Sequence, residues 1–258
     1  MSAAPGPVSL TEARALPGLR LLALGGVPSP WSQAAKGIFH VKKLAHTLAQ
    51  PTADDAPGTL EAWTGQASYP VAVLGDEPPR DGWAEILLLA ERLAPAPALI
   101  PAEAEERTLF FGLCHEIAGE MGLGWCRRLE MVARGMQSEP PDPMSRYLGG
   151  KYGYNEVHAA QATGRVHEIL RMLSARLAAQ QAAGHRYLMG ASLTALDIYW
   201  ATFCNLFSPL PPDRMAMAPA VATMFTSTDP VVAQILTEGL LAHRDLVYAE
   251  HLVLPVVL

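Results

Sequence analysis

Residues 19–32, LRLLALGGVPSPWS, decide how the first part of the chain folds. The apolar run Leu19–Leu24 stops at two glycines, as a buried strand bounded by a turn does. Ser29 and Pro30 stand where a helix begins, because serine caps helix N-termini and proline fits the first turn. Apolar residues then recur at helical spacing as far as Lys43. The stretch therefore predicts a strand, a turn and a helix.

Further short elements follow this unit as far as position 94. Prolines, glycines and capping residues separate them. The expected elements are an edge strand at 44–50, a helical turn at 59–63, a strand at 71–74 and a helix at 81–93 capped by Asp81. Together they predict a small α/β domain over residues 19–94, after a flexible extension at residues 1–18.

A proline-rich linker over residues 95–104 follows this domain. Beyond it, apolar residues recur at helical spacing without an intervening strand pattern, which predicts an all-helical domain over residues 105–258. The expected helices cover residues 105–136, 157–183, 195–207 and 230–251. Residues 138–154 are rich in proline and glycine, so a long loop is expected there.

Composition limits the class of protein. The formal net charge of -6 gives no overall positive field to attract nucleic acid or an anionic membrane. No apolar run approaches the roughly 20 residues that cross a bilayer, and the first residues lack a secretory signal pattern. Cys114, Cys126 and Cys204 form neither a CxxC pair nor a zinc-binding cluster. We therefore expect a cytoplasmic protein without a metal.

Four motifs occur in a fixed order along the chain. They are Ser29-Pro30-Trp31-Ser32 at a helix start, Tyr69-Pro70-Val71 entering a strand, Asp81-Gly82 opening a helix, and Ser192-Leu193-Thr194-Ala195-Leu196-Asp197. In this order they resemble a cytosolic glutathione S-transferase, from about Leu19 to Phe207. The resemblance implies a thioredoxin-like first domain, an all-helical second domain, glutathione as co-substrate and a homodimer.

By position, Ser29 matches the family's hydroxyl that lowers the pKa of the glutathione thiol. A helix N-terminus favours a nearby anion such as a thiolate, because its amides are unpaired and the helix dipole is positive there. Ser29 is alternatively only an N-cap, and both readings stay open. Ser32, one turn further on, is a second candidate for the same hydrogen bond. Omega-like members carry cysteine at position 29, and its absence here favours conjugation over disulfide exchange.

The resemblance places Trp31, Tyr69, Pro70, Asp81 and Gly82 around glutathione. Pro70 matches the family's cis-proline, and Tyr69 before it would present backbone groups to the peptide. Asp81-Gly82 stands where the family usually has a Glu/Gln-Ser pair that holds the γ-glutamyl end. Gly82 keeps the helix N-terminal amide but lacks the hydroxyl. Asp81 is alternatively only a helix cap.

Thr194 and Asp197 follow the S/T-x-x-D pattern of a capping box, in which side chains satisfy backbone donors at a helix start. In the family this box lies within the core of the helical domain. Its expected role is structural, so replacing Asp197 is expected to destabilise the fold.

The sequence therefore predicts a glutathione S-transferase-like enzyme that activates the glutathione thiolate against a small hydrophobic electrophile, in a detoxification role. By family layout, the electrophile lies between the helix at 109–131 and the aromatic loop at 147–154. The alternative is a non-catalytic binding or scaffolding dimer of the same fold, which the missing serine at position 82 favours. A glutathione-dependent reductase or peroxidase is a third reading, against which the missing cysteine at position 29 argues.

Overall fold

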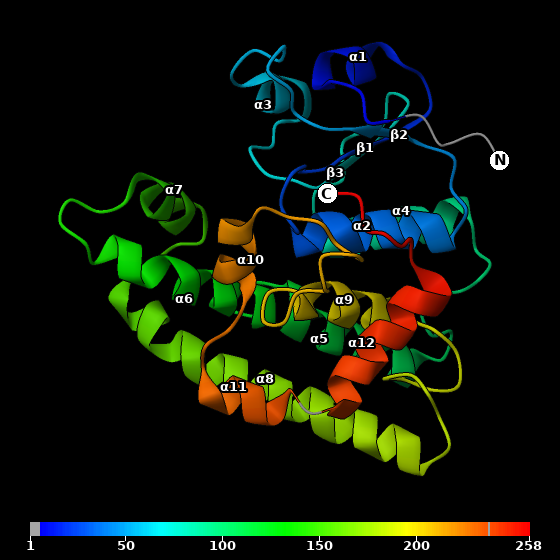
Figure 1. Cartoon of the computed structure of the whole chain (residues 1–258). Coiled ribbons are helices and arrows are strands. Elements are labelled where there is room, and N and C mark those ends of the chain that lie inside the picture. The colour runs from blue at the N-terminus through cyan, green and yellow to red at the C-terminus, as the bar shows by residue number, and fades with distance from the viewer. Residues whose placement is uncertain (1–5, 237) are drawn as a thin grey trace.

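The computed structural model describes residues 6–236 and 238–258 (Figure 1). The first part is built on a three-stranded sheet in the order β2-β1-β3, formed by β1 (Leu19–Leu22), β2 (Thr47–Ala49) and β3 (Val71–Leu74). β1 pairs in parallel with β2 and antiparallel with β3. Arg80 adds one antiparallel bridge to Ala72 on the outer side of β3.

The two faces of the sheet are covered by different helices, because successive strand side chains point to opposite faces. Leu21 and Ala72 pack into the main core with α2 (Pro30–Val41) and α4 (Trp83–Leu93). Leu22, Val71 and Val73 belong to a second cluster with residues of α1 (Leu10–Ala15) and α3 (Thr59–Thr64). Figure 1 shows α1 and α3 on one side of the sheet and α2 on the other.

The flexible extension expected at residues 1–18 is corrected over residues 6–18, while residues 1–5 lie outside the described part. The Val8 amide donates to the Leu48 carbonyl at 3.0 Å, and the Gln50 amide donates to the Val8 carbonyl at 3.0 Å. Helix α1 follows, where the Glu12 amide donates to the Ser9 hydroxyl at 3.2 Å and the Ser9 amide donates to the Glu12 carboxylate at 2.9 Å. These bonds order the segment along the outer edge of β2.

The second part consists of helices packed around α9 (Ala195–Cys204), as the sequence predicts. All residues of α9 are buried, which is typical of a helix at the centre of a bundle. The other helices are α5 (Ala104–Ala118), α6 (Leu123–Met136), α7 (Pro143–Lys151), α8 (Glu156–Ala182), α10 (Pro219–Phe225), α11 (Pro230–Ile235) and α12 (Glu238–His251). Within the described ranges, none of these helices is both long and apolar enough to cross a membrane.

The helix expected over residues 105–136 is two helices, α5 and α6, separated by a glycine-bounded turn. A Cβ built on Gly122 would lie 2.7 Å from the carbonyl oxygen of His115 and 2.8 Å from that of Glu116. Glycine is therefore required where the chain passes so close to the end of α5. A turn of this kind interrupts the helix although the apolar spacing continues through it.

Two further expectations about helices are wrong. The loop expected at 138–154 contains α7, which begins at a cap where the Ser145 amide donates to the Asp142 carboxylate at 2.7 Å. The helix expected over 230–251 is divided into α11 and α12. Capping by Asp142 sets where α7 begins, and capping by Asp229 sets the start of α11 at the expected position.

One continuous apolar core joins the two parts of the molecule. The ring of Trp31 packs edge-on against Phe203 with centroids 4.8 Å apart, and its indole N–H donates to the Ala118 carbonyl at 2.8 Å. The Tyr199 hydroxyl donates to the Trp83 carbonyl at 2.9 Å. After α12 the chain returns toward α2, where the Lys36 ammonium donates to the Val257 carbonyl at 2.5 Å.

Candidate functional site

Three segments far apart in the sequence converge at one small cavity between the sheet domain and the helices. Trp31 from α2, Pro70 from the start of β3, and Asp81 and Trp83 from the start of α4 line it. The cavity volume is about 10 Å³, which is enough for roughly one water molecule. Pockets for small molecules typically measure roughly 300–1,000 Å³, so these residues mark a meeting point rather than an open pocket.

Ser29 lies at the N-cap position of α2, two residues before Trp31. Ser29 is 6% exposed, and its side chain makes no hydrogen bond that caps the helix. The backbone holds it instead, since its amide donates to the Val27 carbonyl at 2.8 Å and its carbonyl accepts from the Gln33 amide at 2.9 Å. The hydroxyl is therefore not engaged in capping, although the residue occupies the capping position.

Ser32 is fully buried, one turn further along α2. Its hydroxyl accepts a hydrogen bond from the Leu24 amide at 3.2 Å, which closes the turn between β1 and α2. A buried amide that lost this acceptor would be costly, so the hydroxyl has a structural use. The two serines that the sequence leaves as alternatives therefore differ in the structure: the Ser32 hydroxyl is used in a turn, whereas the Ser29 hydroxyl does not cap the helix.

Trp31 faces the helical domain. Its indole N–H is already bonded to the Ala118 carbonyl, and its ring lies 6.1 Å from the ring of Tyr152. Trp31 also lines the small cavity. The expected ligand-binding residue thus serves mainly to connect the two domains.

The peptide bond between Tyr69 and Pro70 is cis. The Tyr69 side chain packs against the cluster that α1 and α3 form with the sheet. Burial raises the pKa of Tyr69 to about 12, and the nearby Asp55 and Tyr147 add to this effect. The Tyr69 side chain therefore packs in this cluster in its neutral form.

At the start of α4 the structure corrects one expectation and adds a residue that sequence reasoning missed. The N-cap is Gly82, and Asp81 is exposed just before it. A Cβ built on Gly82 would lie 1.7 Å from Oε2 of Glu85, so that carboxylate folds back over the helix N-terminus. A negative group is favourable there because of the helix dipole. The signal in the sequence was a glutamate at the third helical position.

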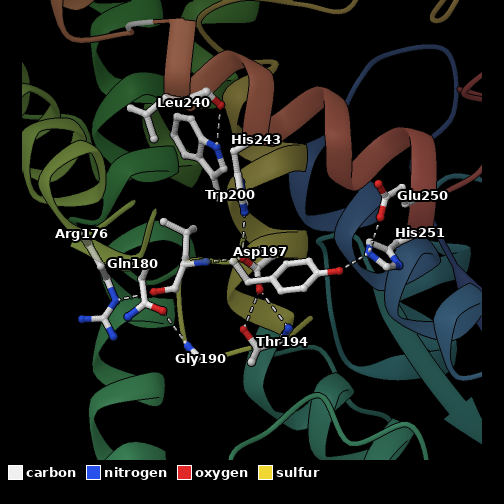
Figure 2. Close-up of polar contacts among 12 residues, drawn as sticks. Arg176, Gln180, Gly190, Thr194, Asp197, Trp200, Leu240, His243, Glu250 and His251 are labelled. Atoms are coloured by element: carbon white, nitrogen blue, oxygen red, sulfur yellow. Dashed lines mark hydrogen bonds and ion pairs between the residues drawn. The ribbon is translucent and has the colours of Figure 1, made fainter. Parts of the chain in front are cut away.

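Thr194 and Asp197 lie away from this site, at the start of α9 (Figure 2). The Thr194 amide and hydroxyl each donate to Asp197 Oδ2 at 2.9 Å, and the Leu188 amide donates to Asp197 Oδ1 at 2.7 Å. Nε2 of His243 lies 3.0 Å from the same Oδ1 without forming a hydrogen bond to it. The four groups are buried together.

The residues expected to hold an electrophile divide between the core and the surface. Phe111 of α5 approaches Trp83 with ring centroids 6.3 Å apart. Tyr152 is buried against Trp125, at 5.1 Å, whereas Tyr147 on α7 is 62% exposed. Burial also raises the pKa of Tyr152. Only Tyr147 of these two tyrosines therefore stands open to a ligand.

No protein-family model matches the chain, and no curated protein matches it in sequence. Solved structures do match it. A glutathione S-transferase from Methylobacterium radiotolerans, in complex with glutathione sulfonate, has a TM-score of 0.60 and 16% identity over 90% of this chain and 91% of that chain. One from Methylobacillus flagellatus with glutathione bound has a TM-score of 0.56 and 12% identity over 87% and 98%. The Tau class glutathione S-transferase of mango, Mangifera indica, has a TM-score of 0.52 and 17% identity over 90% and 98%.

These likenesses cover almost the whole length of both chains in each pair. The protein therefore has the glutathione S-transferase fold, with a thioredoxin-like domain followed by a helical domain. The sequence-based recognition of this fold is confirmed.

Proposed function

We propose that the protein binds glutathione at the meeting point of α2, β3 and α4 and activates its thiol for attack on a hydrophobic electrophile. The observation that carries this proposal is the position of Ser29. Its hydroxyl is not used for capping and lies at the N-terminus of a twelve-residue helix on a glutathione S-transferase fold. The electrophile, a detoxification role and a cytoplasmic location stay predictions from the sequence.

Each part of the site has a separate task in this proposal. The Ser29 hydroxyl donates to the sulfur, and the amides and dipole at the start of α2 favour the negatively charged thiolate. The backbone before Pro70 pairs with the peptide. The start of α4 receives the γ-glutamyl carboxylate, but only after the Glu85 side chain swings away, because two carboxylates repel each other at one helix end.

Glu85 therefore gives the proposal a sharp test by isothermal calorimetry with reduced glutathione. We expect Glu85→Ala to bind glutathione about tenfold more tightly than the wild type, because a competing negative charge is removed. Gly82→Ser in the wild-type background is also expected to strengthen binding, since its Cβ would displace the flexible Glu85 carboxylate and its hydroxyl would supply the donor that Gly82 lacks. Glu105→Ala, at an exposed position in the first turn of α5, is the matched control and should change nothing.

Ser29→Ala tests the chemical role in the same protein. We expect the variant to bind glutathione but to lose the ultraviolet absorbance of the bound thiolate at neutral pH, because the thiol pKa returns toward its usual value near 8.5. If neither the wild type nor Glu85→Ala gives a binding heat, glutathione is not a ligand of this protein.

The second candidate is a non-catalytic dimer of the same fold that binds or scaffolds another molecule. The coverage of the α4 N-terminus by Glu85 and the use of Trp31 inside the core favour it. Absence of glutathione binding in both proteins named above, together with a stable dimer, would select this alternative.

We propose a homodimer formed through exposed leucines on α4 and α5. Leu88 is 46% exposed, Leu93 is 37% exposed and Leu109 is 47% exposed. Exposed large apolar side chains commonly mark an interface where they share one face, and the proposal requires these three leucines to do so in the dimer. Leu88→Glu is expected to convert the dimer to a monomer in light scattering, whereas Val157→Glu on the exposed face of α8 should leave the mass unchanged.

A further inference from the structure

A second cavity lies on the other side of α2 and has no part in the glutathione proposal. Its volume is about 700 Å³, within the range of pockets that hold small molecules. Its apolar wall includes Val8, Phe39, Leu48, Leu252 and Val256. These residues come from the ordered N-terminal segment, from α2, from β2 and from the chain after α12, so the cavity exists only in the folded molecule.

The charged side chains that line this cavity are both positive, Lys36 and Lys43. His40 and His46 line it as well, and no aspartate or glutamate is among the described residues that do. The chain as a whole has a net charge of -6, so the positive charge of this cavity is opposite in sign to that of the molecule. Such a cavity attracts an anion, and its walls require that the rest of the ligand be apolar.

Two polar side chains that line the cavity, those of Gln33 and Lys36, have no carboxylate partner. Gln33 is 7% exposed, and its Nε2 is buried without a hydrogen-bond partner among the described residues. The Lys36 ammonium donates to the Val257 carbonyl, but no carboxylate pairs with it there. Burial lowers the pKa of Lys36 to about 8. Gln33 and Lys36 are three residues apart on α2, so both donors lie on the same helix face.

We propose that this cavity binds a single-chain amphipathic carboxylate of the fatty-acid class, with its carboxylate at Gln33 and Lys36 and its chain along the apolar wall. The cavity follows α2 from Gln33 to His40, a length of about 10 Å at 1.5 Å per residue, and continues past the end of the helix to Lys43. Gln33 and Lys36 can each donate a hydrogen bond to a carboxylate. A hydrogen bond to a charged acceptor is stronger than one between neutral groups.

This site is distinct from the one proposed for glutathione. Gln33, Lys36 and His40 face the large cavity, whereas Ala35 and Ile38 on the other face of α2 line the small one. A ligand in the large cavity therefore does not compete directly for the Ser29 region.

Isothermal calorimetry of the full chain with dodecanoate, below its micelle concentration, tests the proposal. We expect one molecule to bind per chain and Lys36→Met to weaken binding at least about tenfold, the usual cost of losing a charge-assisted hydrogen bond. Lys151→Met, a lysine on α7 outside the cavity, is the matched control and should bind as the wild type does. Saturating glutathione should leave the dodecanoate affinity unchanged, and circular dichroism verifies that each variant is folded.

Dodecyltrimethylammonium has the same chain with a positive head and is expected not to bind. Equal affinity for this cation and for dodecanoate would overturn the proposal, as would unchanged dodecanoate affinity in folded Lys36→Met. No binding of dodecanoate to the wild type would also overturn it.

A measurement on the wild type alone avoids any effect of substitution on folding. A brief pulse of acetic anhydride modifies accessible lysines, and mass spectrometry reports the extent at each position. Dodecanoate should protect Lys36 several-fold and leave Lys151 unprotected. Equal modification of Lys36 with and without saturating dodecanoate would place the ligand elsewhere and refute the assignment.

Discussion

At the scale of single residues, Asp197 shows how one buried carboxylate fixes a helix end. Its oxygens accept from the amide and hydroxyl of Thr194 and from the amide of Leu188, and His243 lies beside them (Figure 2). A buried charge is tolerable only when several donors surround it. Asp197 therefore ties α9, the preceding loop and α12 to one point.

We predict that Asp197→Ala lowers the free energy of unfolding by about 3–5 kcal/mol, because it leaves the buried donors of Thr194 and Leu188 without an acceptor. Urea denaturation followed by circular dichroism measures this. Asp213→Ala, at an exposed position, should stay within about 0.5 kcal/mol of the wild type. A loss for Asp197→Ala no larger than that of this control would contradict the structural role.

At the scale of elements, α1 depends on a carboxylate from another segment. Asp55 Oδ1 accepts from the amide and hydroxyl of Thr11, both at 2.9 Å, and Oδ2 accepts from the amides of Leu10 at 3.2 Å and Thr52 at 2.9 Å. Burial alone would raise the pKa of Asp55, but the hydrogen bonds from Thr52, Thr11 and Leu10 outweigh it and hold the pKa well below its usual value. Ionised Asp55 thus anchors α1 to the loop before α3.

The pH dependence of stability follows from the lowered pKa of Asp55. A carboxylate with a lowered pKa in the folded state stabilises fully above its unfolded pKa of about 3.9, and this contribution is lost as the pH falls toward the folded value. We predict that the difference in urea midpoint between wild type and Asp55→Asn is constant above about pH 5 and shrinks below pH 4. A difference that does not change with pH would show that the ionised form plays no part.

At the scale of the whole molecule, the two domains share one core. Trp31 lies on α2 in the first domain and bonds to Ala118 at the end of α5, and the Tyr199 hydroxyl of α9 reaches the backbone of α4. Separating the two domains would break these contacts and expose the apolar core that they share. The two domains are therefore expected to unfold together.

We predict that tryptophan fluorescence and far-ultraviolet circular dichroism report a single, coincident urea transition. Trp31→Phe keeps most of the ring but leaves the Ala118 carbonyl without its donor, so it should cost about 1–2 kcal/mol. Trp63→Phe removes an indole that makes no hydrogen bond to the described residues and is the control. Separate transitions for the two probes in the wild type would refute the shared core.

The fold could be predicted from the sequence because its signals are local. The strand and helix of residues 19–43, the proline before Val71 and the capping pattern at Thr194 are each set within a few residues of chain. The ordered N-terminal segment escaped this approach although Ser9 and Glu12 form a capping box, because the edge of β2 that holds Val8 is distant in sequence. Helix breaks at glycine turns were missed because apolar spacing continues across them.

The sequence by itself determined the glutathione S-transferase fold and the segments that meet at the candidate site, since short-range capping, turn and strand patterns specify both. Only the tertiary structure decided what the individual side chains do. Ser32 closes a turn, Trp31 bonds to a carbonyl 87 positions away, and Lys36 meets Val257 across 221 positions. The position of Glu85 and the cavity beside α2 depend on the same close packing, because three-dimensional proximity brings together groups that no local pattern relates.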